Sequence, residues 1–149
     1  LQPPLDAIVE FGCGYGTFTI PAARRTIGVV HAIDIERDMV AATCDKARAA
    51  GLTNVQGAVR DFVADGTGLD AGSADYVMLF NILHLEDPLR LLAEAHRVLR
   101  PGGRLGIIHW NYDPSTPRGP DMSIRPRPEQ CFAWAISAEF APLTPIVAG

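Results

Sequence analysis

The sequence predicts an α/β protein built on an open, doubly wound and mostly parallel sheet. Five apolar runs rich in branched residues recur along the chain, and they are nearly continuous rather than alternating with polar residues. This pattern is typical of strands that are covered on both faces. Segments with helix caps and helical spacing lie between most of these runs, as in right-handed crossovers. Since such sheets bind ligands outside the carboxyl ends of their strands, we expect the functional site at that edge.

The predicted elements follow from these runs and from capping residues. The strands are residues 5–11, 29–33, 55–59, 76–80 and 105–110, and the helices are residues 36–50, residues 88–100 and a stretch to Arg25 capped by Thr17 or Thr19. Asp87 is an N-cap residue followed by proline, and Pro101 stops the helix that it begins. Residues 61–74 carry four glycine or serine breaks, so we expect only a short crossover helix there.

The length of 149 residues suits a single domain, residues 1–149, with its core in residues 5–110. A proline-rich loop at residues 114–128, a helix around residues 129–140 and a possible strand at residues 141–149 are expected to follow.

The composition argues against several kinds of partner. A formal net charge of −4 gives no general attraction to phosphate backbones or anionic lipid. Arg118, Arg125 and Arg127 come closest to a basic patch, but they lie among prolines and are interpreted as a solvated loop. The longest apolar stretch, residues 76–85, is about half as long as a membrane span. We therefore expect neither nucleic acid nor a membrane as a partner.

The three cysteines, Cys13, Cys44 and Cys131, are odd in number and widely separated. They have neither the paired spacing of a zinc site nor the even count of a disulfide framework. We therefore expect no metal site and a reducing, cytoplasmic location. Nothing in the sequence indicates the oligomeric state.

A glycine turn follows the first predicted strand. Gly12, Gly14 and Gly16 allow a sharp turn into a helix and let a ligand touch the main chain, although a tight turn alone would also explain them. The dinucleotide fingerprint places its third glycine three positions after its second, where this chain has Thr17. The register therefore argues against a nicotinamide or flavin cofactor.

With Glu10 two places before Gly12, this run resembles the first motif of class I S-adenosylmethionine-dependent methyltransferases. The resemblance extends to Asp34 ending the second strand, Asp61 after the third, and residues 97–105 before the fifth. It implies the Rossmann-like methyltransferase fold, with S-adenosylmethionine as cofactor. Members of this family have a helix before the first strand and a final antiparallel strand pair. This chain shows only part of these terminal elements, and we expect a trimmed chain rather than a sheet completed by a partner.

The resemblance also implies roles for individual residues. Asp34 accepts from both ribose hydroxyls, with an N-cap for the next helix as the alternative. Asp61 accepts from the adenine amine, with a turn residue as the alternative. Phe62 and Ile35 cover the adenine ring, unless they are simply core residues.

The methionine part of the cofactor is expected over the glycine turn, where Cys13 is interpreted as a packing residue. Glu10 resembles the family's acidic residue near the cofactor's amino group, and its sign suits a cationic ligand. Asn81 and Phe80, at the end of the fourth strand, are expected to offer backbone carbonyls to the same ammonium.

His84, just past the fourth strand, is our candidate general base for an acceptor that loses a proton. The alternatives are a partly buried histidine with a backbone partner, or the shoulder of the helix that begins at Asp87. His109, Trp110 and Tyr112 end the fifth strand and are candidates to line the acceptor pocket. Because His109 and Trp110 are adjacent in a strand, at most one of them faces the site. The two remaining histidines, His31 and His96, are interpreted as structural.

The leading hypothesis for function is methyl transfer to a small-molecule acceptor by in-line attack on the sulfonium methyl. Residues 81–84 read Asn-Ile-Leu-His rather than the Asn-Pro-Pro-aromatic signature that enzymes methylating amide or base nitrogens resemble. The alternatives are an S-adenosylmethionine-binding scaffold without catalysis and a nicotinamide-dependent oxidoreductase.

Overall fold

The computed structural model describes residues 6–143, whose five strands form one sheet in the order β3-β2-β1-β4-β5. The strands are β1 (Ala7–Phe11), β2 (Val29–Asp34), β3 (Val55–Val59), β4 (Ala74–Phe80) and β5 (Leu99–Ile108). All neighbouring strands are parallel. The strand order reverses between β1 and β4, so the switch point at which such sheets bind ligands lies between their carboxyl ends.

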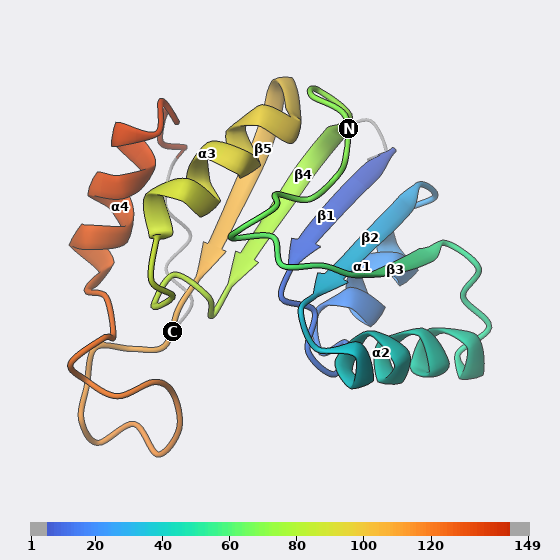
Figure 1. Cartoon of the computed structure of the whole chain (residues 1–149), viewed down its shortest axis with the longest axis horizontal. Coiled ribbons are helices and arrows are strands. Elements are labelled where there is room, and N and C mark those ends of the chain that lie inside the picture. The colour runs from blue at the N-terminus through green and yellow to red at the C-terminus, as the bar shows by residue number, and fades with distance from the viewer. Residues whose placement is uncertain (1–5, 144–149) are drawn as a thin grey trace.

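Helices cover both faces of the sheet, as predicted (Figure 1). They are α1 (Thr19–Arg25), α2 (Arg37–Ala49), α3 (Pro88–Val98) and α4 (Pro128–Ser137). α1 and α2 contact β2, while α3 contacts β5 and α4. The predicted doubly wound α/β fold is therefore confirmed.

Alternation along β1 divides the core between the two helical layers. Val9 and Phe11 belong to one buried cluster with Leu92 of α3, whereas Ile8 belongs to another with Ala23 of α1. Successive side chains of a strand point to opposite faces, so Glu10 shares the side of Ile8 and points toward α1. Burial on both sides explains why β1, β2 and β4 read as continuous apolar runs, whereas the edge strand β3 is mostly exposed.

Several predicted helix boundaries agree with the structure. α2 lies within the predicted residues 36–50, and Glu36 and Ala50 are its caps. The predicted N-cap of α3 is also present, since the Oδ1 of Asp87 accepts from the Arg90 N–H at 3.0 Å.

The predicted caps of α1 were wrong. Phe18 occupies the N-cap position and makes no capping bond with its side chain. The hydroxyl of Thr19 instead donates to Glu10 of β1, which ties the first turn of the helix to the sheet.

The boundaries of β5 also differ from the prediction of residues 105–110. β5 begins at Leu99, which pairs with Ala74, and the register then shifts before Arg104 pairs with Tyr76. The segment with Pro101 and the glycines is thus a bulge inside the strand rather than a connection before it. The strand ends at Ile108, so the next two residues lie beyond it.

The crossover from β3 to β4 contains turns but, in this part of the described chain, no helix, so the expected short helix was wrong. A carboxylate from α3 holds the segment in place, because Glu94 accepts from both the N–H and the hydroxyl of Thr67, at 2.8 and 2.7 Å. Residues 141–143 form no strand, and the remainder of the predicted strand at 141–149 lies outside the described residues, as does Leu5.

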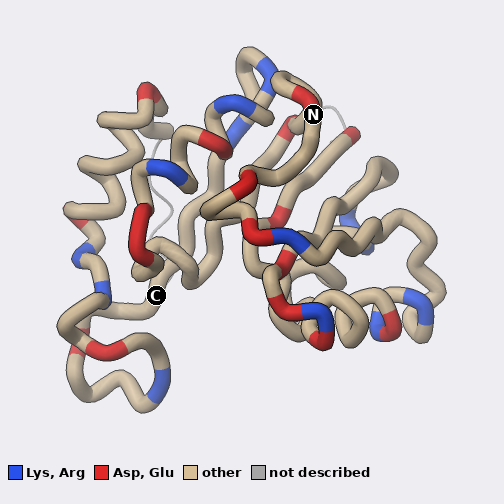
Figure 2. Tube along the Cα trace, in the orientation of Figure 1, with Lys and Arg blue, Asp and Glu red and all other residues tan. Residues whose placement is uncertain are grey.

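Charged residues of both signs are distributed over the whole fold (Figure 2). The loop before α4 was predicted to be solvated, yet Arg125 is only 7% exposed. Its guanidinium donates to the carbonyl oxygens of Asn111, Asp113 and Pro120 at 2.7 to 3.2 Å, and so holds the loop together. Among residues 6–143, no helix combines the length and apolar character required to cross a membrane.

Candidate cofactor and acceptor site

The glycine turn leaves β1 at the switch point of the sheet. Gly12, Gly14 and Gly16 have φ values of +76°, +51° and +80°, which side chains rarely tolerate. The N–H groups of Gly12 and Cys13 donate to the carbonyl oxygen of Ile33 at 2.8 and 3.0 Å, so the turn is fastened to the end of β2. The predicted sharp turn is therefore present.

The three glycines differ in what lies beside them. A Cβ on Gly12 would lie 3.0 Å from the Cγ2 of Ile82, and one on Gly16 would lie 3.1 Å from the Oγ1 of Thr43. A Cβ on Gly14 would have no atom within 4 Å. Gly12 and Gly16 thus let the protein pack closely, whereas the space beside Gly14 is open. The N–H and carbonyl groups of Gly14 are bonded to Asp34 and Thr43, at 2.9 and 2.8 Å.

Asp34 lies directly beside Gly14. Its Oδ2 accepts from the N–H of Gly14 at 2.9 Å, and its Oδ1 accepts from the N–H of Glu36 at 3.0 Å. The alternative interpretation of Asp34 as the N-cap of α2 was wrong, because Glu36 occupies the N-cap position and Asp34 ends β2. A carboxylate oxygen has a second acceptor site, so half-buried Asp34 can still accept from ligand hydroxyls.

Asp61 begins the turn after β3. Its Oδ1 accepts from the N–H groups of Val63 and Ala64 at 3.1 and 2.9 Å, so it is a turn residue, as the alternative interpretation held. Its Oδ2 receives no hydrogen bond from the described residues, so one oxygen is available to a ligand amine.

The two predicted covers of the adenine ring have different environments. Phe62 is 7% exposed, and its ring packs against Phe11 with centroids 5.4 Å apart, so it is largely a core residue. Ile35, in contrast, is 57% exposed and follows Asp34 at the end of β2. Ile35 therefore has apolar surface to offer a ligand beside that carboxylate.

Glu10 is buried beneath the turn, where Thr19 donates to it. Burial raises the pKa of Glu10 to about 7, and the nearby charge of Asp34 acts in the same direction, while the Thr19 hydrogen bond opposes them. Near neutral pH the carboxyl is thus poised between its protonated and ionised forms, and a cationic ligand close by would favour the ionised form.

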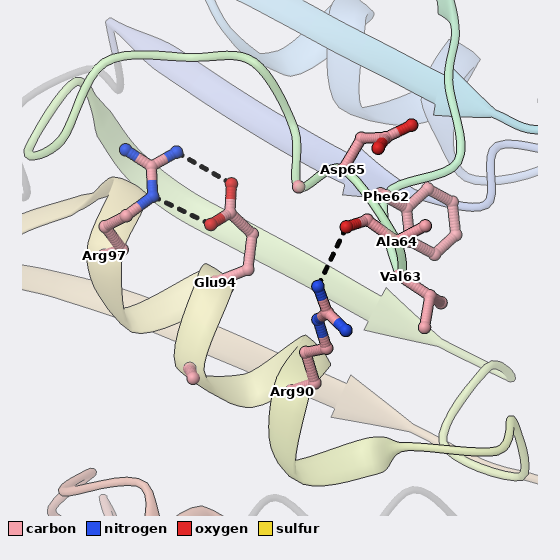
Figure 3. Close-up of a pocket in the computed structure, with 9 residues that line it drawn as sticks. Phe62, Val63, Ala64, Asp65, Arg90, Glu94 and Arg97 are labelled. Carbon is pink, nitrogen blue, oxygen red and sulfur yellow. Dashed lines mark hydrogen bonds and ion pairs between the residues drawn. The ribbon is translucent and has the colours of Figure 1, made fainter.

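A shallow pocket of about 380 Å³ lies between α3 and residues 62–66, which belong to the crossover from β3 to β4 (Figure 3). Arg90 donates to the carbonyl of Ala64 at 2.8 Å, and Glu94 pairs with Arg97 at 2.7 Å. Arg90, Glu94 and Arg97 thus already bind one another or the main chain. None of the glycines of the turn lines it, so this pocket is not the predicted cofactor site.

Two histidines meet at the carboxyl ends of β4 and β5. The Nδ1 of His84 lies 3.3 Å from the Nε2 of His109, with the ring centroids 5.5 Å apart. Burial lowers the pKa of each ring, and the charge of Arg125 further lowers the pKa of His109. Sequence reasoning singled out His84 but missed this contact, because it placed His109 inside the strand rather than just beyond it.

Asn81 joins the ends of the same two strands. Its N–H donates to the carbonyl oxygen of Ile108 at 2.7 Å, and its φ of +59° turns the chain out of β4. Asparagine tolerates this left-handed conformation better than most residues do. The side chain of Phe80 packs edge-on against Phe18, 4.9 Å away, on the α1 side of the sheet.

The remaining candidates make structural contacts. The guanidinium of Arg127 covers the ring of Tyr112 at 4.2 Å, and His96 packs against Phe140 with ring centroids 5.3 Å apart. Cys13 is buried, which raises the pKa of its thiol to about 12 and keeps it protonated, as befits a packing residue. His31 is half-buried within β2, and burial lowers its pKa.

Comparison with known proteins identifies the family. A family model described as a methyltransferase domain matches residues 8–103, more than half of the chain. An uncharacterised 37.1 kDa protein in transposon TN4556 of Streptomyces fradiae is 35% identical over 124 residues, which cover 81% of this chain and 35% of that protein. An uncharacterised methyltransferase of Mycobacterium tuberculosis is 36% identical over 104 residues, which cover 70% of this chain and 39% of that protein.

The fold has a similar counterpart among solved structures. A SAM-dependent methyltransferase from Aquifex aeolicus superposes with a TM-score of 0.80 at 24% identity, covering 89% of this chain and 71% of that one. The chain spans little more than a third of the length of the two relatives described above. Together with the matched family model, these findings show that the chain belongs to the class I S-adenosylmethionine-dependent methyltransferases, with S-adenosylmethionine as its cofactor.

Proposed function

We propose that this chain holds the cofactor site of an enzyme that methylates a small molecule by in-line attack of the acceptor on the sulfonium methyl. The observation that carries the proposal is the pairing of Asp34 with Gly14, which has open space beside it, at the switch point of the sheet. A carboxylate beside such open space suits a ligand with a hydroxylated sugar and an extended polar tail.

We assign the cofactor's groups to the residues around that pair. Asp34 accepts from the ribose hydroxyls, and Asp61 accepts from the adenine amine through its unoccupied Oδ2. Ile35 covers the adenine ring, and Phe62 supports the site from the core. The methionine part lies over the turn formed by Gly12, Gly14 and Gly16.

The ammonium of the cofactor lies near Glu10 and the main chain at Asn81 in this proposal. A cation favours the ionised form of Glu10, whose raised pKa makes its charge sensitive to a nearby ligand.

The acceptor binds near His84 and the end of β5. When bound, the cofactor supplies a methyl group whose C–S electron pair stays on sulfur as the acceptor's lone pair forms the new bond. The protein therefore has to align the acceptor, exclude water and receive any proton that the acceptor loses. His84 is the residue to which we assign that proton.

A small-molecule acceptor is favoured by two features. The chain after β4 lacks the Asn-Pro-Pro-aromatic signature. In the loop before α4, which is the most basic segment, the guanidinium of Arg125 donates to main-chain carbonyls and that of Arg127 stacks on Tyr112. This leaves little basic surface for a phosphate backbone.

Calorimetry tests the cofactor assignment directly. S-adenosylmethionine and S-adenosylhomocysteine should both bind, whereas NAD(P) should not. Binding of neither sulfur compound would indicate a scaffold that has lost the site. Hydride transfer with NAD(P), together with no response to S-adenosylmethionine, would identify an oxidoreductase instead.

The acceptor is then sought with the full-length gene product and S-adenosylmethionine labelled in its methyl group. Transfer of label to a small-metabolite pool would support the proposed activity. Cofactor binding without transfer to any pool would support the second candidate, a binding protein without catalysis.

A further inference from the structure

We propose that His109 is a positioning residue for His84: it fixes the His84 ring in the Nδ1–H form, so that His84 Nε2 accepts the proton that a hydroxyl acceptor loses. The role of His84 as the base rests on the proposed function. The tautomer that His109 imposes does not, and it can be measured separately.

A main-chain carbonyl group fixes the position of the proton on His109. The Nδ1 of His109 lies 3.4 Å from the main-chain oxygen of Trp110, which can only accept a hydrogen bond. The attractive arrangement therefore places the proton of neutral His109 on Nδ1. Since a neutral imidazole carries one such proton, the Nε2 of His109 is left as an acceptor.

The contact between the two rings in turn determines which nitrogen of His84 carries the proton. Its Nδ1 faces the Nε2 of His109 at 3.3 Å, so the proton between the rings belongs to His84. The Nε2 of His84 then carries a lone pair, and it receives no hydrogen bond from the described residues. The tautomer of one ring nitrogen is thus set by what the other nitrogen contacts.

Burial favours the neutral form of both rings. His84 follows β4, His109 follows β5, and Arg125 approaches His109 from the loop before α4. Burial lowers the pKa of both rings. For His109 the hydrogen bond to the Trp110 carbonyl opposes this effect, while the charges of His84 and Arg125 add to it. A neutral pair near pH 7 is the state in which His84 can accept a proton.

This arrangement also indicates the class of acceptor. A tertiary amine or a thioether gains a methyl group without losing a proton and has no use for a base. A hydroxyl oxygen forms its new bond to carbon as its proton leaves, and that proton passes to Nε2 of His84. The imidazolium that forms keeps its Nδ1–H bond to His109, then releases its new proton to solvent.

Nitrogen NMR tests the tautomer without any acceptor. In protein labelled with ¹⁵N-histidine, two-bond correlations distinguish Nδ1–H from Nε2–H rings, and His84→Gln identifies the His84 signals. At about pH 7 we expect His84 in the Nδ1–H form, which is the less common form of an unrestrained imidazole. His84 in the Nε2–H form would overturn the proposal. A wild-type spectrum in which all four histidines are in the Nε2–H form would do so even if no variant folded.

Two substitutions of His109 sharpen the test. His109→Gln keeps a side-chain carbonyl at the position of Nε2 and should retain the Nδ1–H form, whereas His109→Leu should convert His84 mainly to Nε2–H. His96→Gln is the control. Because His96 packs against Phe140, its substitution should leave the tautomer of His84 unchanged. An Nδ1–H signal that persists in His109→Leu would remove the positioning role.

Calorimetry with S-adenosylmethionine on the same samples separates the two proposals. Loss of the expected tautomer with normal cofactor binding contradicts only the inference about His109. The expected tautomer without cofactor binding contradicts only the proposed function.

Discussion

Asp34 and Gly14 are joined by a hydrogen bond of 2.9 Å that runs from the main-chain N–H of the glycine to the Oδ2 of the carboxylate. The same carboxylate binds the N–H of Glu36, the N-cap residue of α2. Asp34 therefore holds the glycine turn against the end of β2, in addition to the cofactor contact that we propose for it. Its contributions to folding and to cofactor binding have to be separated by experiment.

Asp34→Ala is expected to weaken S-adenosylmethionine binding by about 1 to 3 kcal/mol, roughly 5- to 150-fold in Kd, because hydrogen bonds to a charged group are lost. It should also lower the melting temperature, since the Gly14 and Glu36 N–H groups lose their partner. Calorimetry and thermal unfolding measure the two effects.

Asp34→Asn is the matched control, because its side-chain oxygen can still accept from one of these N–H groups. We expect most of the melting temperature to return while cofactor affinity stays reduced. Affinity equal to that of the wild type in both variants would remove Asp34 from the site.

Gly14→Ala and Gly16→Ala should separate ligand contact from packing. Both substitutions force an alanine into a left-handed conformation, at a cost of about 1 kcal/mol each. Only at Gly16 does the new methyl group also press on Thr43, so Gly16→Ala should unfold at the lower temperature. At Gly14 the methyl group enters open space where we place the cofactor, so affinity should fall at least about tenfold. The reverse order of the two effects would contradict the assignment.

Glu10 gives the stability of the protein a definite pH dependence. The carboxyl ionises near its ordinary value of 4.5 when unfolded and near 7 when folded, so unfolding releases a proton between these values. Its contribution to stability is complete below about pH 4.5 and is lost as the pH rises through about 7, by about 3 kcal/mol in total.

Glu10→Gln removes this titration while keeping an acceptor for Thr19. The free energy of unfolding of the variant, relative to the wild type, should therefore rise from about pH 5 to about pH 8. Denaturant unfolding at several pH values measures it. The histidines titrate in both proteins and cancel in the comparison. Parallel curves for the two proteins would show that Glu10 is ionised in the folded state throughout.

Much of the fold could be predicted from the sequence because strands leave short apolar runs, which reflect burial in β1, β2 and β4 although not in the exposed edge strand β3. β1, β2, β3 and β4 each appear as a short apolar run, and Asp87 marks the start of α3. The start of β5 was missed because Pro101 and its neighbouring glycines indicate a break, whereas pairing with β4 carries the strand through a bulge. That pairing is a tertiary effect that no local pattern contains.

Less of the candidate site could be predicted from the sequence. The glycine spacing and the position of Asp34 are local, and the structure brings them together. Phe62 was proposed as a cover for the ligand, but packing against Phe11 makes it chiefly a core residue. The contact between His84 and His109 depends on where two strands end relative to each other, which the sequence does not state.

Arg125 controls the order of the loop that leads from β5 to α4. Its planar guanidinium donates to three main-chain carbonyls at once, and a lysine ammonium cannot reproduce this fork. Arg125→Lys should therefore open the loop and expose the Arg118–Gly119 bond to trypsin, since Arg125 and Arg127 precede prolines and are poor cleavage sites. Loss of about 1 to 2 kcal/mol of hydrogen bonding should speed cleavage there by roughly 5- to 30-fold. Arg24→Lys, an exposed substitution on α1, should leave the rate unchanged, and equal rates in both variants would show that the clamp does not order the loop.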